Sequence, residues 1–284
     1  MDCPICGGPS TLDERHPEVE LGHCTRCGHR FSQVKPGVAM EPYDAAYFEE
    51  THRNWFSHPN LALFEQIARL VDREPTPGSL IDVGCGNGAL LHYLSGRSAL
   101  SPVALTGVDL AANGPEAGIE FIQGDIFLLD IARQFSIVVS LMTIEHIADI
   151  RGFVRRLRAL ARPGGLVVIN TINDDSTVYG AARMLRRFGV VLPFDRLYSR
   201  HHLHHFGRAS LSQLLHSEGL SPTGVILGNA PLAALDIPVS SRAASLILRG
   251  AVSSLFALGS LSGRTYAQTV VCRREASEQL LEQV

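Results

Sequence analysis

Three aspartates follow three successive hydrophobic segments, and each stands where a strand is expected to end. Asp82 lies near the end of the first segment, a predicted strand over Ser79 to Val83. Asp109 ends the next run, and Asp125 follows a third. Because parallel strands place their carboxyl ends at one edge of a sheet, we expect these carboxylates to share a pocket. Such a pocket would attract a cation and repel a pyrophosphate.

A glycine-rich loop follows Asp82 and leads into a predicted helix, Ala89 to Leu94. Glycines allow a tight turn and a close approach of the backbone to a ligand, and the helix N-terminus offers free N–H groups. The loop also satisfies the dinucleotide pattern G-x-G-x-x-G/A. The carboxylate of Asp82 beside it favours S-adenosylmethionine over NAD. The loop residues expected to contact the cofactor are Gly84, Cys85, Gly86, Asn87 and Gly88.

Each acid has a predicted task in holding a cationic nucleoside. Asp82 would attract its ammonium and sulfonium groups, Asp109 would accept from both ribose hydroxyls, and Asp125 would accept from the adenine amino group. Neighbouring positions at the strand ends complete the predicted cofactor-binding set: Leu110, Ile126 and Met142.

Five ordered motifs resemble those of the class I methyltransferases. They are Asp82-Val83-Gly84-Cys85-Gly86-Asn87-Gly88, Gly107-Val108-Asp109, Gly124-Asp125-Ile126, Ile144-Glu145-His146 and Arg162-Pro163-Gly164-Gly165, and the match runs from about Tyr43 to His216. The resemblance implies an α/β, Rossmann-like sheet of seven strands, with the seventh antiparallel between the fifth and the sixth.

The elements that must position these residues follow from apolar periodicity. After Ser79 to Val83, strands are predicted over Val103–Val108, Ile119–Ile122, Ser136–Leu141, Leu166–Ile169, Thr223–Leu227 and Thr265–Cys272. Further helices are predicted over Asn60–Val71, Asp149–Ala161, Val178–Phe188 and Ser210–Ser217. A row of four arginines on the helix before Pro163-Gly164-Gly165 is interpreted as a solvated face. Ala111 to Gly118 is too short and broken for the family's second helix, so a loop is expected there.

We expect a zinc ribbon over residues 1–36, a helical cofactor-covering segment over 37–75 and the methyltransferase domain over 76–274. The domain would carry an acceptor lid at 173–206 and an apolar helical insertion at 231–263, and 275–284 would be a tail. In the subgroup with an N-terminal ribbon, the segment after it covers the cofactor. Tyr43, Tyr47 and Phe48 would then line that pocket, or else pack in the core.

Two CxxC pairs near the N-terminus have the spacing of a four-cysteine zinc site: Cys3, Cys6, Cys24 and Cys27. With all four positions filled by protein, the zinc would be structural and would not activate water. His16, His23 and His29 are then expected at the surface. The ribbon would either recognise an acceptor, RNA or a partner, or pack against the main domain.

Glu145-His146 stands just beyond the fourth predicted strand and resembles the Glu-His pair of the ubiquinone-type O-methyltransferases. A neutral histidine is suited to removing the acceptor's proton near pH 7. In part of that family an earlier glutamate helps to bind a divalent ion, but Met142 stands there in this chain. The alternative is that Glu145 and His146 cap the following helix.

The run His201-His202-Leu203-His204-His205 lies in the predicted lid. His202 or His205 is a second candidate for the base or for binding an acceptor oxygen, and the other histidines are expected to be exposed. Nearby arginines would favour an anionic acceptor such as a phosphorylated sugar, or form a solvated face: Arg183, Arg186, Arg187, Arg196 and Arg200.

The segment Ala244 to Leu261 is strongly apolar, yet Arg249, two glycines and four serines argue against a membrane span. Our first interpretation is a buried cap helix or the face of a homodimer. The second is peripheral membrane contact, or a channel for an apolar acceptor.

The sequence favours O-methylation of a small-molecule or saccharide acceptor, which a lipid could carry. One alternative is an RNA methyltransferase that uses the ribbon as an RNA grip. Against it stand the net charge of -3 and the run Ser140-Leu141-Met142-Thr143, where many amino-methylating enzymes of nucleic acids have Asn/Asp-Pro-Pro-aromatic. Another is a non-catalytic cofactor-binding scaffold. No signal peptide precedes Cys3, which predicts a cytoplasmic location.

Overall fold

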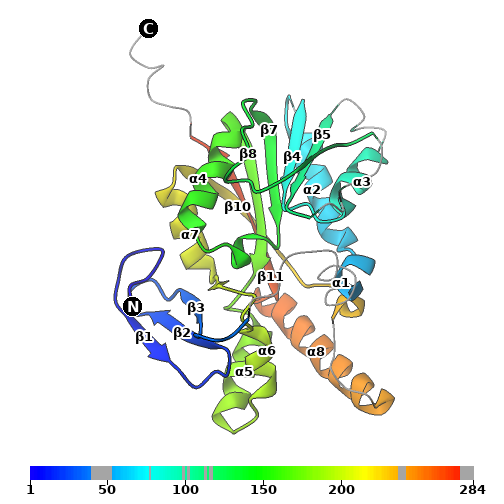
Figure 1. Ribbon diagram of the computed structural model, residues 1–284. Helices are drawn as coiled ribbons and strands as arrows, with labels where there is room; N and C mark the ends of the chain where they lie inside the picture. The colour runs from blue at the N-terminus through cyan, green and yellow to red at the C-terminus, as the bar shows by residue number, and fades with distance from the viewer. Residues whose placement is uncertain are drawn as a thin grey trace.

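Two sheets and the helices around them make up the described part of the chain (Figure 1). The computed structural model describes residues 1–39, 53–76, 78–97, 100, 103–111, 114, 118–235 and 241–275. Tyr43, Tyr47 and Phe48, and most of the predicted loop from Ala111 to Gly118, lie outside these residues.

The larger sheet has seven strands in the order β10-β11-β8-β7-β4-β5-β6. These strands are β4 (Ser79–Val83), β5 (Ala104–Asp109), β6 (Glu120–Gln123), β7 (Phe135–Leu141), β8 (Ala161–Ile172), β10 (Leu220–Gly228) and β11 (Ala267–Arg274). β11 pairs antiparallel with both β8 and β10, whereas β6, β5, β4, β7 and β8 are parallel to one another. The predicted α/β sheet with an antiparallel seventh strand is therefore confirmed.

Helices cover both faces of this sheet (Figure 1). On one face, α4 (Ile150–Leu160) and α7 (Arg208–Ser217) pack their leucines and Phe153 into the core. On the other face lie α2 (Leu61–Arg73) and α3 (Ala89–Ser95). The apolar spacing predicted these helices because only one stripe of each is buried. The buried stripe of α2 consists of Phe64, Ile67, Ala68 and Val71, whereas Leu61 in its first turn is 56% exposed.

The smaller sheet contains β1 (Ser10–Asp13), β2 (Val19–Cys24) and β3 (Arg30–Val34) of the N-terminal region. Its fourth strand, β9 (His204–His205), comes from the insertion after β8 and pairs antiparallel with β3. His16 and His29 were expected at the surface, and this prediction is wrong. Both are buried because the N-terminal sheet packs against the insertion.

The insertion after β8 contains α5 (Thr177–Arg187) and α6 (Leu192–Leu197). Short helices border the sheet elsewhere: α1 (Arg53–Ser57), η3 (Ile144–His146) and η4 (Leu232–Ala234). The last helix, α8 (Arg242–Ser262), projects beside α5 and α6 at the lower end of the molecule in Figure 1.

Three expectations for these elements are wrong. α8 is not a buried cap: Leu246 and Ile247 are each 71% exposed, and only Phe256 and Gly259 are buried. β8 begins at Ala161 rather than at the predicted Leu166, so Pro163-Gly164-Gly165 lies inside the strand. The arginines of α4 are not simply solvated, because Arg151 and Arg156 donate to backbone carbonyls of other segments.

Candidate functional site

A cavity of about 1130 Å³ lies at the carboxyl ends of β4, β5 and β7. The cavity is lined by Asp82 near the end of β4, Asp109 at the end of β5 and Asp125 just after β6. This edge is where ligands bind in open α/β sheets, because the strand order reverses there and leaves a crevice. The cavity therefore unites the acidic set that the sequence predicted.

Asp82 carries the least solvated of the three carboxylates. The residue is 2% exposed, and its Oδ1 is buried without a hydrogen-bond partner among the described residues. Burial, and secondarily the nearby charge of Asp109, raise the pKa of Asp82 to about 7. A cation bound beside this carboxylate would supply the missing counter-charge.

The other two aspartates accept hydrogen bonds from backbone N–H groups of the loops around the cavity. Gly86 N–H donates to Asp109 Oδ2 at 2.8 Å, and Ala111 N–H donates to Asp109 Oδ1 at 3.0 Å. Asp125 Oδ1 accepts from the N–H of Phe127 at 2.9 Å. A carboxylate oxygen can accept more than one hydrogen bond, so both side chains keep acceptor capacity for a nucleoside.

Position 84 requires a glycine for two reasons. Its φ of 78° lies in the left-handed region, and a Cβ there would stand 2.3 Å from Thr143 Oγ1. The cavity is also lined by most of the other predicted loop and strand-end residues: Cys85, Gly86, Asn87, Leu110, Ile126 and Met142. Gly88 does not line it but precedes the first turn of α3 as its N-cap.

Met142 lies in a strained backbone conformation beside the cavity. Its φ is 51°, and no other non-glycine residue in the described ranges has a positive φ. Its N–H donates to the carbonyl of Asn170 at 2.9 Å, which anchors the end of β7 to β8. Such strain is typical of backbone that is held in place for function.

His146 lies on η3 and lines the same cavity. Its Nδ1 is 2.7 Å from the carbonyl oxygen of His201. A carbonyl can only accept, so this contact places the ring proton on Nδ1 and leaves the lone pair of the neutral ring on Nε2. His202 also lines the cavity, with its ring centroid 5.0 Å from that of His146.

Glu145 is fully buried at the wall of the cavity. Thr171 Oγ1 donates to its Oε2 at 2.8 Å, while Oε1 is buried without a partner among the described residues. Burial raises the pKa of Glu145 to about 7, against the opposing effects of its own backbone N–H and of the Thr171 hydroxyl. The helix-capping alternative is wrong, because Asp149 caps α4 by accepting from Gly152 N–H.

His205 is not brought into the cavity lining. Its ring is fully buried, and its Nε2 lies 2.8 Å from Ser32 Oγ of β3. His204 is likewise buried, 3.1 Å from His29. The expectation that the remaining lid histidines are exposed is wrong for His204, since this part of the lid forms β9.

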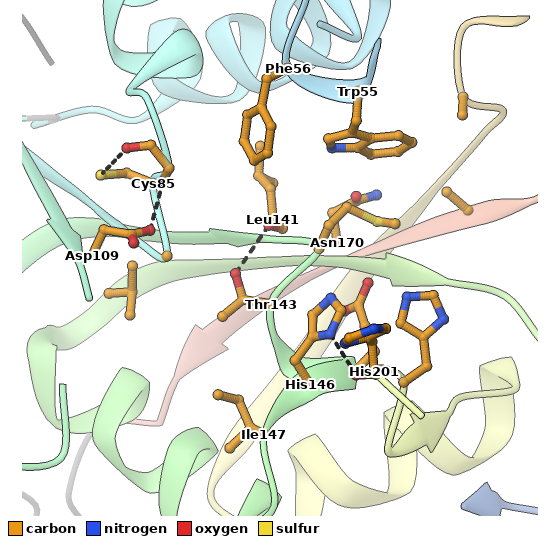
Figure 2. Close-up of a pocket in the computed structure, with 18 of the residues that line it drawn as sticks. Trp55, Phe56, Cys85, Asp109, Leu141, Thr143, His146, Ile147, Asn170 and His201 are labelled. Carbon is orange, nitrogen blue, oxygen red and sulfur yellow. Dashed lines mark hydrogen bonds between the residues drawn. The ribbon is translucent and has the colours of Figure 1, made fainter. Parts of the chain in front are cut away.

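Aromatic residues that the sequence did not single out form the opposite wall. In Figure 2, Trp55 and Phe56 of α1 lie across the cavity from His146 and His201. The cavity is also lined by Tyr266 and by Glu18 of the N-terminal region. The only tryptophan of the chain, adjacent to a phenylalanine, was the available signal for this wall.

Most of the arginines of the lid have acidic partners. Arg183 pairs with Asp174, Arg186 with Asp13 and Arg200 with Glu18. Of the five lid arginines, Arg196 and Arg200 line the cavity. The solvated-face interpretation is therefore wrong for the three that form ion pairs.

The four N-terminal cysteines form one cluster. All four Sγ atoms lie within 4.8 Å of one another, with Cys3 and Cys27 at 3.5 Å and Cys6 and Cys24 at 3.4 Å. Four Zn–S bonds of about 2.3 Å in a tetrahedron separate the sulfurs by about 3.8 Å. The donor set and the spacing fit a structural zinc ion.

The model of the "Methyltransferase domain" family matches residues 46–223. A ubiquinone biosynthesis O-methyltransferase of Bordetella bronchiseptica is 30% identical over 217 residues, which cover 67% of this chain and 85% of that protein. The Stutzerimonas stutzeri enzyme of the same name is 29% identical, and the match spans 48% of its length.

Solved structures share the fold at low sequence identity. A chain of the complex between the Haloferax volcanii Trm112 methyltransferase activator and a methyltransferase superposes with a TM-score of 0.52 at 14% identity, covering 81% of this chain and 92% of that one. An S-adenosylmethionine-dependent methyltransferase of Archaeoglobus fulgidus gives 0.50 at 14% identity, covering 80% and 97%.

Proposed function

Because the chain belongs to the family of S-adenosylmethionine-dependent methyltransferases, we propose that it methylates a hydroxyl oxygen of a small, amphipathic acceptor. The observation that carries this proposal is the single cavity that three aspartates share with His146. One end offers carboxylates to a cationic nucleoside, and the other offers a histidine to a hydroxyl. The name of the Bordetella relative supports oxygen as the acceptor atom.

When bound, S-adenosylmethionine supplies an electrophilic methyl group on a sulfonium. The chain would hold it with the residues of the glycine loop and with Asp82, Asp109 and Asp125. His146 Nε2 would take the proton of the acceptor hydroxyl, with the ring oriented through Nδ1 and the carbonyl of His201. Enclosure by the cavity walls would align the acceptor oxygen with the methyl group and limit water.

An aromatic head group fits the acceptor end better than a saccharide does. Trp55, Phe56 and Leu141 offer flat or apolar surface there, whereas a saccharide needs many hydrogen bonds. A phenolic hydroxyl, with a pKa of about 10, also loses its proton to a neutral imidazole more readily than an ordinary alcohol does.

The exposed apolar residues of α8 support a further part of the proposal, that the protein touches a lipid surface. By length and composition α8 could cross a bilayer, with a mean hydropathy of 1.5. Phe188, at the tip of α5, is 79% exposed, and the residues after it, from Val190 to Leu192, are exposed as well. Thr177 Oγ1 donates to the carbonyl of Leu255, so α5 and α8 are in contact.

Charge favours a lipid surface over a second copy of the chain as the partner of α8. α8 contains two arginines, Arg242 and Arg249, and no acidic residue. Arginines beside exposed apolar residues match anionic head groups, whereas self-association would bring like charges together. An acceptor with an apolar tail could then reach the cavity from the bilayer, since η4 lines it and Arg249 of α8 donates to Leu232 of η4.

Zinc in the four-cysteine cluster is also proposed, as a structural ion. Backbone N–H groups of Ile5 and Arg26 point at Cys3 Sγ and Cys24 Sγ, each at 3.4 Å, as is common around thiolates. A cytoplasmic location, where thiols stay reduced, belongs to the same proposal.

The test is transfer of a labelled methyl group from S-adenosylmethionine to decylcatechol, decyl glucoside and RNA. We expect the catechol to be labelled, and His146→Gln to slow this reaction by about 10²–10⁴-fold with little change in cofactor affinity. Labelling of the glucoside alone would replace the phenolic acceptor by a saccharide. Labelling of RNA alone would contradict a small-molecule acceptor, and no labelling with intact cofactor binding would favour a scaffold.

A further inference from the structure

The histidine segment, residues 201–205, lies between the N-terminal sheet and the cavity. Its last two residues form β9, in which His205 pairs with Arg30 and His204 with Phe31 of β3. At its other end, His201 and His202 line the cavity. The segment therefore connects the cysteine-bearing region to the proposed base.

Leu203, in the middle of the segment, is bonded through its backbone on both sides. Ser32 N–H of β3 donates to the carbonyl of Leu203 at 2.8 Å, and Leu203 N–H donates to the carbonyl of Glu145 at 2.8 Å. One residue thus joins the edge of the N-terminal sheet to the residue that precedes His146. Backbone groups at both contacts are fixed in direction, so a displacement of β3 would shift η3.

The carbonyl that orients His146 lies two residues earlier in the same segment. It belongs to His201 and is 2.7 Å from His146 Nδ1. Its position depends on Leu203 and on β9, because few residues separate them. Side-chain contacts also join this part of the lid to the N-terminal region: Ser32 with His205 at 2.8 Å, and Glu18 with Arg200.

We propose that the N-terminal sheet acts as a positioning element for the base. Through Ser32 and Leu203 it fixes the His201 carbonyl, so that His146 keeps its proton on Nδ1 and presents Nε2 to the acceptor. This inference rests on the proposed role of His146. It assigns the cysteine-rich region a part in turnover that recognition of an acceptor would not require.

The test compares two substitutions of Ser32 in the full chain. Ser32→Pro removes the N–H that donates to Leu203 together with the hydroxyl, whereas Ser32→Ala removes the hydroxyl alone. We expect methyl transfer to decylcatechol to fall at least about tenfold in Ser32→Pro and less than about threefold in Ser32→Ala. Cofactor affinity should change less than about twofold in both, because the glycine loop is held by other contacts.

Nitrogen NMR of histidine-labelled protein provides a second measurement, the position of the ring proton of His146. The signals of His146 are identified by their absence in His146→Gln. In the parent protein the proton should reside on Nδ1, and in folded Ser32→Pro the two tautomers should mix. Parental turnover in folded Ser32→Pro, or a proton on Nε2 of His146 in the parent, would overturn the proposal. Retained turnover in His146→Gln would instead contradict the proposed function, and the NMR result would still report on positioning.

Discussion

Thr171 Oγ1 donates a hydrogen bond of 2.8 Å to Glu145 Oε2, and this is the one side-chain hydrogen bond that the structure gives that buried carboxyl group within the described residues. Burial raises the pKa of Glu145 to about 7. Ionisation of this carboxyl group therefore lowers the stability of the folded protein, at a cost in free energy that is complete above that pH. The cost is absent below the ordinary pKa of a glutamate and grows as the pH rises toward 7.

Glu145→Gln should therefore gain stability relative to the parent as the pH rises. The difference in unfolding free energy between the two proteins should increase by up to about 3 kcal/mol from pH 5 to pH 8. Guanidinium unfolding at both pH values measures it. Thr171→Val removes the donor to the carboxylate. Its unfolding free energy should therefore fall more steeply with rising pH than that of the parent. An equal difference between Glu145→Gln and the parent at both pH values contradicts the buried, shifted carboxyl group.

The raised pKa of Asp82 predicts how cofactor affinity depends on pH. Its pKa of about 7 in the free protein, raised by burial and then by Asp109, means that it is partly protonated near neutrality. Binding of a cation favours the ionised form and releases the proton. Affinity for S-adenosylmethionine should thus rise about tenfold per pH unit below 7 and level off above it. Calorimetric titration at several pH values measures this slope.

Asp82→Asn tests whether Asp82 is the group that releases the proton on cofactor binding, and His146→Gln is its matched control from the same cavity. The asparagine variant should bind more weakly at pH 8 and lose the slope, because no proton is released on binding. The glutamine variant should keep the slope of the parent. A slope that persists without the carboxyl group would assign the proton to another residue.

The parts of the fold that carry a local signal were predictable from the sequence. Phe153, Leu157 and Leu160 repeat at helical spacing because one stripe of α4 faces the sheet, and glycines mark the turn after β4. The acids at strand ends could be grouped because parallel strands end at a common edge. These inferences needed only the residue pattern within each segment and the parallel arrangement of the strands.

Contacts between distant segments had no such signal. The pairing of Phe31 with His204 joins residues far apart in the sequence, and neither segment has the alternation of a typical strand. A histidine run was therefore interpreted as an exposed lid, although β9 buries half of it. For the same reason Trp55 and Glu18 were not assigned to the cavity, since their position depends on tertiary packing.

The cysteine cluster predicts one zinc ion per chain in protein prepared under reducing conditions. Native mass spectrometry should show this ion in the parent and its loss in Cys24→Ser, because a serine hydroxyl is a poor substitute for a thiolate. The melting temperature of Cys24→Ser should fall by at least about 5 °C, since small zinc-binding modules generally depend on the metal for their fold. Cys85→Ala, in the cofactor loop, is the control and should retain the ion. A parent protein without zinc, or a Cys24→Ser variant that keeps it, contradicts the site.

The exposed face of α8 predicts binding to anionic vesicles. The parent should sediment with vesicles of phosphatidylcholine and phosphatidylglycerol, and less with phosphatidylcholine alone, because arginines flank the apolar residues. Replacing Leu246 and Ile247 together by aspartate should weaken this binding at least about tenfold, since two exposed apolar side chains lose their contact with lipid. Leu12→Asp, at an exposed leucine of β1, is the matched control and should bind like the parent. If the double variant still binds vesicles, or if the parent is a dimer that the double substitution dissociates, α8 is not the lipid-binding surface.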